Sequence, residues 1–472
     1  MKQLDRRWKV LLVTSVAVFM AFLDVTIVNV AFPSVREEFP DTSLAGLSWV
    51  LNAYNIVFAA LLVPAGRLAD LLGRRRLFFF GLAVFVLASA LCGLAPSAEW
   101  LVAARALQAV GAAVLVPTSL GLLLPEFPPE RRASATALWA AVGGVAAATG
   151  PSLGGLLIEW ADWRLVFFVN LLFGAVAWVP ARRLLREFRD DERGAAPDAV
   201  GIGLLAGGVG LLSLAIVEAP DWGWGSPSVL GALAVSALLL AAFVARSARH
   251  PHPVLELSLF RLRSFAAACA GIFVFSLGFY ALLLAGVLFL TSVWGFSTLE
   301  AGFAVTPGPL MAALSSALAG RVIDRYGQRV VAVPGGLVFA AGALAFSIGL
   351  GPTPAYVTEF LPATMLTGIG VGLSFAGFST AAVAGLPPAR FATGSAISAC
   401  FRQLGAVLGI SVLIAVLPNF ELAYALIAVT GAAAGLIALT LRRDRATVPA
   451  WTSKSAPSTT PSSASVPSAA RS

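Results

Sequence analysis

Long apolar runs, separated by short polar segments, dominate the hydrophobic pattern of this 472-residue chain. An α-helix rises 1.5 Å per residue, so about 20 apolar residues are needed to cross a bilayer core of about 30 Å. The pattern therefore predicts fourteen transmembrane helices, at residues 10–32, 49–69, 77–95, 100–124, 134–158, 163–181, 198–218, 227–246, 265–290, 298–320, 329–350, 357–385, 391–417 and 420–441.

Composition supports an all-α membrane protein. Hydrophobic residues make up 58% of the chain and charged residues only 12%, whereas about a quarter of the residues in a soluble domain are charged. The net charge of +8 does not indicate a nucleic-acid partner, because the basic residues lie in short segments between apolar runs rather than on one folded face. We expect the lipid bilayer to be the surrounding medium, and a monomer to be the working unit.

The distribution of Lys and Arg predicts the topology. If the N-terminus is cytoplasmic, most of the 32 basic residues fall in cytoplasmic segments, as the positive-inside rule requires. An even number of crossings then places both termini in the cytoplasm. The opposite loops carry acids and tryptophans, such as EWADW at residues 159–163, and tryptophan is the usual interfacial anchor. We expect a multi-pass protein of the plasma membrane.

An internal repeat divides the chain. GRLADLLGR at 66–74 returns as GRVIDRYGQR at 320–329, and LQAVG at 107–111 is echoed by LTGIG at 366–370. Two related six-helix halves separated by two extra helices explain both offsets, and repeats of this kind build transporters with a site between the halves. The predicted segments are a cytoplasmic N-terminus at 1–9, a bundle at 10–181, a linker at 182–197, the extra helices at 198–246, a loop at 247–264, a second bundle at 265–441 and a disordered cytoplasmic tail at 442–472.

Two charged residues lie inside the predicted spans of the first half. Asp24 interrupts the first apolar run, and Arg105 lies about five residues into the fourth. An acid at this depth costs about 2.5–3.5 kcal/mol on insertion scales, so it usually has a partner or a task. A buried Arg holds a nearby carboxylate ionised, and protonation of that carboxylate releases the Arg. We hypothesise that Asp24 exchanges a proton and that Arg105 senses the exchange.

Both residues also have a purely structural interpretation. Asp24 is then a protonated or locally bonded packing residue, and Arg105 is held by backbone carbonyls. Intramembrane charges more often mark a pathway, which favours the functional hypothesis.

Five motifs in the first half of the chain carry a family resemblance. The chain resembles the major facilitator superfamily, and within it the fourteen-helix drug:proton antiporter branch. The segments that carry the resemblance are LDVTIVNVAFP at 23–33, GRLADLLGRRR at 66–76, RALQAVGAA at 105–113, GPSLGG at 150–155 and WRLVFFVN at 163–170. The resemblance implies a fold of two pseudo-symmetric six-helix bundles plus two extra central helices. It also implies alternating access and export driven by the proton motive force, without another cofactor.

Two of these motifs predict conformational elements. In the 66–76 loop, Gly73 permits a sharp turn, and Asp70 can bond Arg74 to form a charged latch that would favour the state closed to the cytoplasm. The residues predicted for this element are Gly66, Asp70, Gly73 and Arg74, and Asp324 is the counterpart in the repeat. In the fifth span, Gly150-Pro151 forces a bend, and Gly154 and Gly155 allow a neighbouring backbone to approach. The alternative for the 66–76 loop is that its arginines only set the topology. The alternative for Gly150-Pro151 is a static kink.

Several polar residues are candidates for a substrate cavity: Asn29, Asn52, Asn55, Gln108 and Arg402. They are equally explained as interhelical hydrogen bonds without a transport role. Arg402 differs from the others because no span of the second half offers it an acidic neighbour.

A pocket with apolar walls and few charges suits a lipophilic small molecule, and the lack of a deep acid in the second half favours monovalent or neutral compounds over dications. The first alternative is a facilitator or proton symporter for a small metabolite; a second is a membrane sensor or scaffold without transport. An enzyme is not expected, because a membrane-embedded enzyme would need paired His, Ser-His or metal ligands at membrane depth, and the chain has only two His, both in a loop. ATP is not expected as the energy source, because the chain has no P-loop.

Overall fold

The computed structural model describes residues 5–128, 131–188, 198–251, 253–386 and 390–441. Over these ranges the chain is helical and contains no strand. The α-helices are α1 (Arg6–Glu38), α2 (Leu44–Leu72), α3 (Arg74–Gly93), α4 (Ala98–Leu123), α5 (Arg132–Trp160), α6 (Leu165–Leu184), α7 (Ala199–Trp222), α8 (Pro227–Arg249), α9 (Arg263–Ser292), α10 (Thr298–Val305), α11 (Pro307–Tyr326), α12 (Arg329–Gly349), α13 (Leu361–Ala384), α14 (Phe391–Val416) and α15 (Phe420–Ala438).

The fourteen predicted spans are confirmed: the described residues contain fourteen helical segments long and apolar enough to cross a membrane. One span is divided, because α10 ends at Val305 and α11 starts at Pro307, which is the first residue of the new helix. Proline has no N–H to continue the hydrogen-bond ladder, and it is well tolerated at a helix start. A π-helical turn at Tyr356–Phe360 precedes α13. The sequence pattern did not predict either irregularity.

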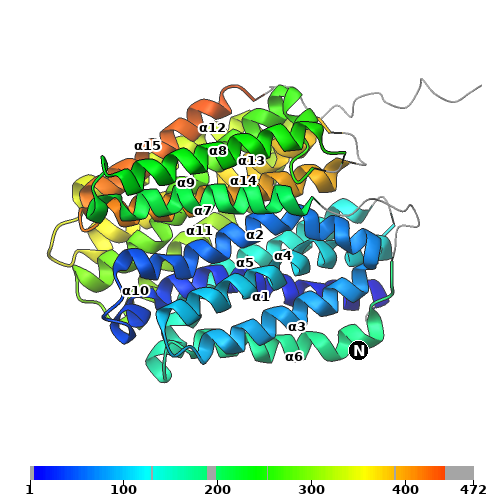
Figure 1. Cartoon of the computed structure of the whole chain (residues 1–472), viewed down its shortest axis with the longest axis horizontal. Helices are drawn as coiled ribbons and strands as arrows, with labels where there is room; N and C mark the ends of the chain where they lie inside the picture. Colours follow the sequence, from blue (N-terminus) through cyan, green and yellow to red (C-terminus); the bar gives the residue numbers. More distant parts are fainter. Residues whose placement is uncertain (1–4, 129–130, 189–197, 252, 387–389, 442–472) are drawn as a thin grey trace, which may run out of the picture.

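The helices form two bundles whose long axes run roughly parallel (Figure 1). In the first bundle α1 packs on α4, α5 and α6, and α4 packs on α2 and α3; in the second, α13 packs on α11 and α12, and α15 packs on α9 and α12. We call the end where α1 begins and α2 terminates the basic end, and the opposite one the far end. The predicted segments 1–4, 189–197 and 442–472 lie outside the described residues.

The repeated sequences occupy equivalent places in the two bundles. Gly111 lies so close to α3 that a Cβ added to it would be 2.5 Å from the Phe85 nitrogen. Likewise, a Cβ added to Gly370 would be 2.5 Å from the Phe339 nitrogen of α12. In the loop repeat, Gly73 and Gly327 both have positive φ, at 107° and 86°. Such a φ strains any residue with a side chain, so each loop requires glycine at this position.

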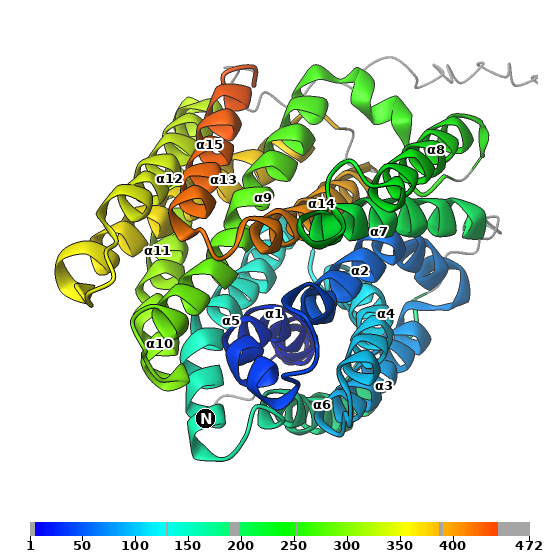
Figure 2. The same cartoon turned by 60° about the vertical axis from the view of Figure 1, so that its left-hand side comes forward.

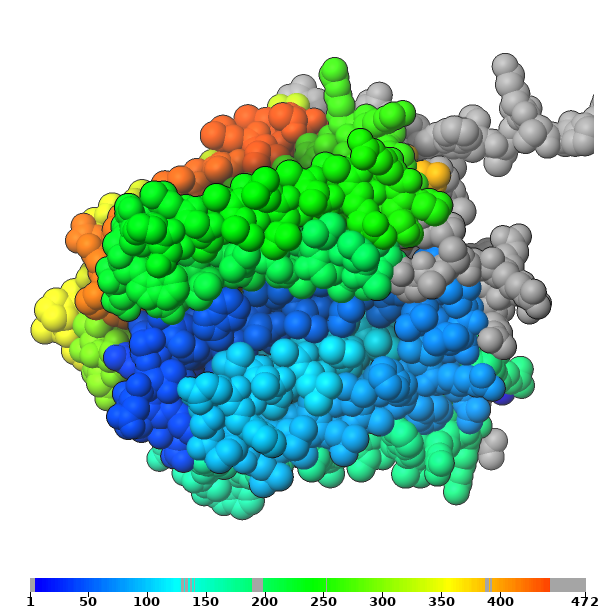
Figure 3. Space-filling view, in the orientation of Figure 1, coloured from blue at the N-terminus to red at the C-terminus, as the bar shows by residue number. Residues whose placement is uncertain are grey.

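The helices α7 and α8 are central only along the chain. In space α7 packs on α8, α2 and α14, and the pair lies at the edge of the molecule (Figure 2). Figure 3 shows them as a continuous exposed band over one face. The two extra helices are thus central in chain order, as predicted, and peripheral in space. Bundle interiors are already filled by six helices each, so the additional pair packs against the outside of the α2–α14 seam.

Asp198 fixes the start of this additional pair. Its Oδ1 accepts hydrogen bonds from the Gly201 N–H at 2.9 Å and from Arg246 Nε at 2.7 Å. Asp198→Ala is expected to reduce the free energy of unfolding by about 1 kcal/mol, the usual value of an N-cap. Thermal unfolding of the purified protein measures this loss, and Asp221→Ala, at the exposed end of α7, is the matched control. An equal melting temperature for wild type and Asp198→Ala would contradict the assignment.

Candidate functional site

The candidate site is a buried polar cluster inside the first bundle, centred on Asp24 of α1. The Asp24 side chain is fully buried, and its Oδ2 forms an ion pair with Arg105 Nη1 of α4, which is 1% exposed. The predicted proximity of these two residues is confirmed. Their roles in proton coupling stay a prediction.

Arg105 is held from three directions. Its Nη1 also donates to Gln108 Oε1 at 2.7 Å, and its Nε donates to the Val50 carbonyl at 3.1 Å. The guanidinium carbon lies 4.2 Å from the centroid of the Tyr54 ring, a cation–π contact. Val50 and Tyr54 both belong to α2, so Arg105 connects the charge on α1 to the position of α2.

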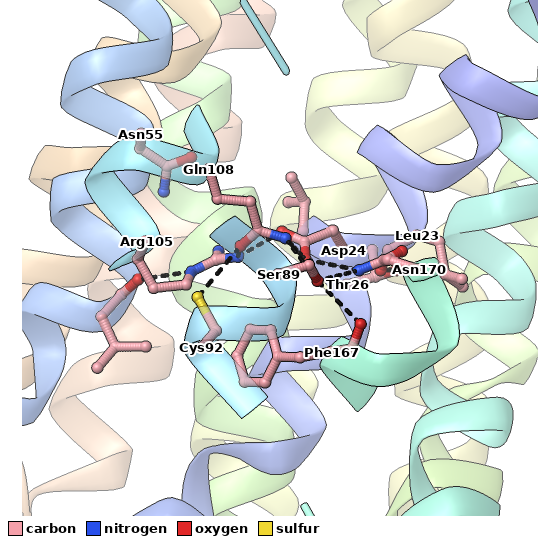
Figure 4. Close-up of polar contacts among 12 residues, drawn as sticks. Leu23, Asp24, Thr26, Asn55, Ser89, Cys92, Arg105, Gln108, Phe167 and Asn170 are labelled. Atoms are coloured by element: carbon pink, nitrogen blue, oxygen red, sulfur yellow. Dashed lines mark hydrogen bonds and ion pairs between the residues drawn. The ribbon is translucent and has the colours of Figure 1, made fainter. Parts of the chain in front are cut away.

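The second oxygen of Asp24 is bound by amides. Asp24 Oδ1 accepts from Gln108 Nε2 at 2.8 Å and from Asn170 Nδ2 of α6 at 3.3 Å. Both amides also donate to Ser89 Oγ of α3, at 3.2 and 3.0 Å respectively. Figure 4 shows Asp24 between Gln108 and Asn170, with Ser89 beside them. The cluster thus draws its side chains from four helices of one bundle.

Asn170 and Ser89 were not among the residues predicted for the site. The signal for Asn170 was present, because it is the polar end of the WRLVFFVN segment inside an apolar span. Ser89 gave no comparable signal, since an isolated serine is common in membrane helices and packs as a small residue.

The arrangement holds a charged side chain inside the bundle. The ionised carboxylate has one cationic and two amide donors, which compensates for its burial. Protonation of Asp24 removes the charge that Arg105 pairs with, while the contacts of Arg105 to Gln108 and Val50 do not depend on that charge. Within the described ranges, no group of three His, Cys, Asp or Glu that could hold a metal ion is found.

The other cavity candidates lie at different places. Asn29 Nδ2 donates to the Val25 carbonyl at 2.6 Å, and its buried Oδ1 has no hydrogen-bond partner. Asn52 Nδ2 donates to Ser213 of α7 and Ser411 of α14, at 3.3 and 3.2 Å. Asn52 therefore makes the interhelical bonds that were the alternative to a cavity role.

Asn55 and Arg402 lie where the bundles meet. Asn55 Oδ1 accepts from Gln403 Nε2 at 3.0 Å, and Gln403 Oε1 accepts from the Tyr280 hydroxyl at 3.2 Å. Arg402, on α14, faces Phe22 of α1. By contrast, Gln108 lies in the polar cluster of the first bundle. For all five candidates, contact with substrate stays a prediction.

The predicted latch is formed within the first bundle. Arg74 Nε donates to Asp70 Oδ1 at 2.8 Å, and Arg74 Nη1 donates to the Gly121 carbonyl of α4 at 2.8 Å. Glu187, after α6, accepts from the backbone N–H groups of Arg75 and Arg76 at 2.9 and 3.2 Å, so it caps the start of α3. These bonds tie α2, α3, α4 and the segment after α6 together, and none of them reaches the second bundle.

The counterpart loop is different. Asp324 is exposed, and the described residues give it no hydrogen bond or ion pair. Gln328 takes the place of Arg74, so the charged partner is missing from the repeat. Gly66 packs on α4, where an added Cβ would be 3.4 Å from Pro117. The latch is thus a property of the first bundle alone.

Asp70→Ala is expected to slow transport up to about fivefold without changing insertion, because partly exposed ion pairs contribute about 0.2–1 kcal/mol. The Asp70–Arg74 pair is 42% and 30% exposed. Initial transport rates at equal membrane abundance measure the effect. Asp324→Ala is the matched control. Equal transport rates for Asp70→Ala and wild type would contradict a role of the latch in transport.

Two faces of α5 approach different bundles. On one face, an added Cβ on Gly150 would be 2.0 Å from Thr26 Oγ1, and one on Gly154 would be 2.8 Å from Ile27, both in α1. The other face meets the second bundle. A Cβ on Gly155 would be 2.9 Å from the Leu299 Cα, and the Pro151 carbonyl oxygen would be 2.5 Å from a Cβ on Gly302.

The close approach predicted for Gly154 and Gly155 is confirmed. The fifth helix stays continuous through Pro151. Because α10 starts at Thr298, its contact with α5 closes the seam between the bundles at the far end. Ser34 Oγ of α1 and Thr298 Oγ1, 3.4 Å apart, lie at the same seam.

Comparisons with known proteins agree with this geometry. The model of the Major Facilitator Superfamily matches residues 14–260 and 268–470. The chain belongs to the major facilitator superfamily. Proteins similar to this chain include the multidrug resistance protein Stp of Mycobacterium tuberculosis, strain CDC 1551 / Oshkosh, which is 35% identical over 86% of this chain and 75% of that protein. The superfamily assignment and the fourteen apolar helices make the chain a multi-pass membrane protein.

Two further relatives are resistance proteins whose names include a compound. The tetracenomycin C resistance and export protein of Streptomyces glaucescens is 32% identical over 86% of this chain and 75% of that protein. The puromycin resistance protein pur8 of Streptomyces alboniger is 36% identical over 89% of this chain and 83% of that protein.

Among solved structures, the chain is similar to a bacterial homologue of the human lysosomal transporter Spinster, in an inward-facing and unoccupied conformation. The TM-score is 0.59 at 18% identity, and the match covers 93% of this chain and 95% of the other. This likeness supports the superfamily fold.

Proposed function

We propose that this protein is a secondary transporter that exports lipophilic small molecules in exchange for protons. The relatives named above are resistance and export proteins, which supports efflux of drug-like compounds. The observation that carries the coupling proposal is the buried Asp24–Arg105 pair, a single titratable acid held by a cation inside one bundle. The energy source is the proton motive force, and no other cofactor is required.

Protonation acts on the bundle interface through α2. When Asp24 binds a proton, its ionic contact with Arg105 is lost, and the guanidinium is then held mainly by the Val50 carbonyl and the Tyr54 ring of α2. Because α2 packs along α14 of the second bundle, a shift at α2 changes how the bundles meet. The protonated protein and the substrate-bound protein thus favour different conformations, which exchange requires.

The orientation follows from charge. The basic end faces the cytoplasm, both termini lie there, and the far end faces the outside of the plasma membrane. The α5–α10 contact then lies on the outer side, which supports a conformation whose substrate site is reached from the cytoplasm. The working unit is a monomer in the lipid bilayer, and the protein catalyses no chemical conversion of its substrate.

Everted membrane vesicles test this proposal. Fluorescent lipophilic compounds of positive, zero and negative charge are added outside, and their accumulation is followed with an acidic interior and after the gradient is collapsed. Accumulation of at least one compound that requires the gradient is expected. Accumulation that is independent of the gradient would indicate a facilitator, and gradient-driven release would indicate a symporter. No movement of any compound would favour a sensor or scaffold.

A further inference from the structure

Arg402 lies at the middle of the molecule, between the two bundles. It is near the centre of α14 (Phe391–Val416), and its guanidinium carbon is 5.5 Å from the centroid of the Phe22 ring, near the centre of α1. The contact therefore joins the second bundle to the first at mid-depth. This is the level at which transporters built from two repeats hold their substrates.

The charge of Arg402 lacks an anion. Its side chain is half-buried, and its buried Nε has no hydrogen-bond partner. No described acidic side chain forms an ion pair with it. A ring face attracts a cation only weakly compared with a carboxylate, so the Phe22 contact does not replace a counter-ion. A guanidinium at membrane depth without a counter-ion usually belongs to a substrate pathway.

The deep acid of the first bundle does not fill this role. Asp24 is fully buried, and its oxygens are occupied by Arg105, Gln108 and Asn170. The negative charge of Asp24 and the positive charge of Arg105 cancel. The positive charge of Arg402 is therefore left uncompensated inside the described spans. The interface between the bundles is therefore positive, which favours an anion and disfavours a cationic drug.

Small residues of α5 lie beside the Phe22 ring that Arg402 faces. Gly143 of α5 packs on Phe22, with 3.2 Å from an added Cβ to the ring, and Gly144 faces open space with nothing within 4 Å of an added Cβ. On its other side, Arg402 adjoins Gln403, which links Asn55 of the first bundle to Tyr280 of the second. A ligand held by Arg402 thus lies beside a polar link between the bundles.

We propose that Arg402 recognises the anionic group of a lipophilic acid, a carboxylate or an acidic phenol, in the transport site of this protein. The guanidinium offers paired donors that match a carboxylate, and Phe22 offers an aromatic face to the apolar body of the ligand. This inference rests on the proposed transport function and specifies its substrate class.

Binding of three pyrene probes to the purified full-length protein tests the proposal. The probes share one apolar body and differ in charge: 1-pyrenebutyrate, its neutral methyl ester, and the matching butyl trimethylammonium cation. Affinities are measured in lipid nanodiscs by energy transfer from tryptophan to pyrene. Wild type is expected to bind the carboxylate about tenfold more tightly than the ester, a typical gain for one charge-assisted contact.

Two variants assign the preference to Arg402. Arg402→Gln is expected to bind carboxylate and ester equally, and Arg402→Lys to retain part of the preference, because it keeps the charge but loses the paired donors. A matching elution profile and melting temperature for each variant exclude misfolding. Equal affinities for the three probes in wild type, no binding of any probe, or an unchanged preference in Arg402→Gln would overturn the proposal.

The binding measurement needs no proton gradient, so it separates this inference from the proposed function. A carboxylate preference that depends on Arg402, combined with no gradient-driven accumulation in vesicles, would reject proton-coupled export and retain the anion site. Gradient-driven accumulation without the carboxylate preference would reject the anion site alone.

Discussion

Replacing Asp24 with Asn is expected to reduce gradient-driven export at least about 100-fold, while the protein still inserts into the membrane. Asparagine cannot exchange a proton, and it leaves Arg105 buried without its anion. A 100-fold loss corresponds to about 3 kcal/mol, the lower end of the cost of breaking a buried ion pair. Initial rates in everted vesicles at equal protein abundance measure the loss.

The control for Asp24→Asn removes a carboxylate from an exposed ion pair. Asp5, 55% exposed, pairs with Arg7 outside the bundle interior, and Asp5→Asn is expected to transport like wild type. Binding of 1-pyrenebutyrate checks that Asp24→Asn is folded. Full gradient-driven transport by the folded Asp24→Asn variant would contradict a role for this carboxylate.

Gly155→Val is expected to hold the far end open and to lower export by about tenfold or more. Even a Cβ at this position would be 2.9 Å from the Leu299 backbone, so a valine cannot fit while α5 and α10 are in contact. Because exchange requires each end to close in turn, a protein that cannot close the far end loses turnover.

Labelling of a reporter cysteine measures closure of the far end. Ser34 lies at the seam beside Thr298, and the native Cys92, Cys269 and Cys400 are buried. In a Ser34→Cys background, Gly155→Val is expected to increase the rate of reaction with a membrane-impermeant maleimide. Gly210→Val is the control, because an added Cβ on Gly210 meets nothing within 4 Å. An unchanged labelling rate in Gly155→Val would show that the seam tolerates the side chain.

The number of spans and the contact between Asp24 and Arg105 could be predicted from sequence for a physical reason. In a membrane, every apolar run of sufficient length becomes a helix, and two opposite charges at similar depth in one bundle attract each other strongly. The sequence repeat also corresponds to a structural repeat, because Gly73 and Gly327 both have positive φ.

Helix neighbours were harder to predict. Apolar residues cover both lipid-facing and buried faces, so periodicity does not tell which helix a side chain meets. For this reason Asn52 gave no hint of its partners on α7 and α14, and the sequence did not indicate that α7 and α8 lie at the edge of the molecule. Ser89 and Glu187 act through partners far away in the chain, which a single sequence does not reveal.

The account rests on Asp24 as the carrier of the exchanged proton, and substrate-driven proton flux tests this most directly. Purified protein is reconstituted into liposomes that contain a pH indicator, and a gradient of a transported compound is imposed without an initial pH difference. Wild type is predicted to move protons against the direction of the compound, and Asp24→Asn to move none. Proton flux of equal size in wild type and Asp24→Asn would contradict the account.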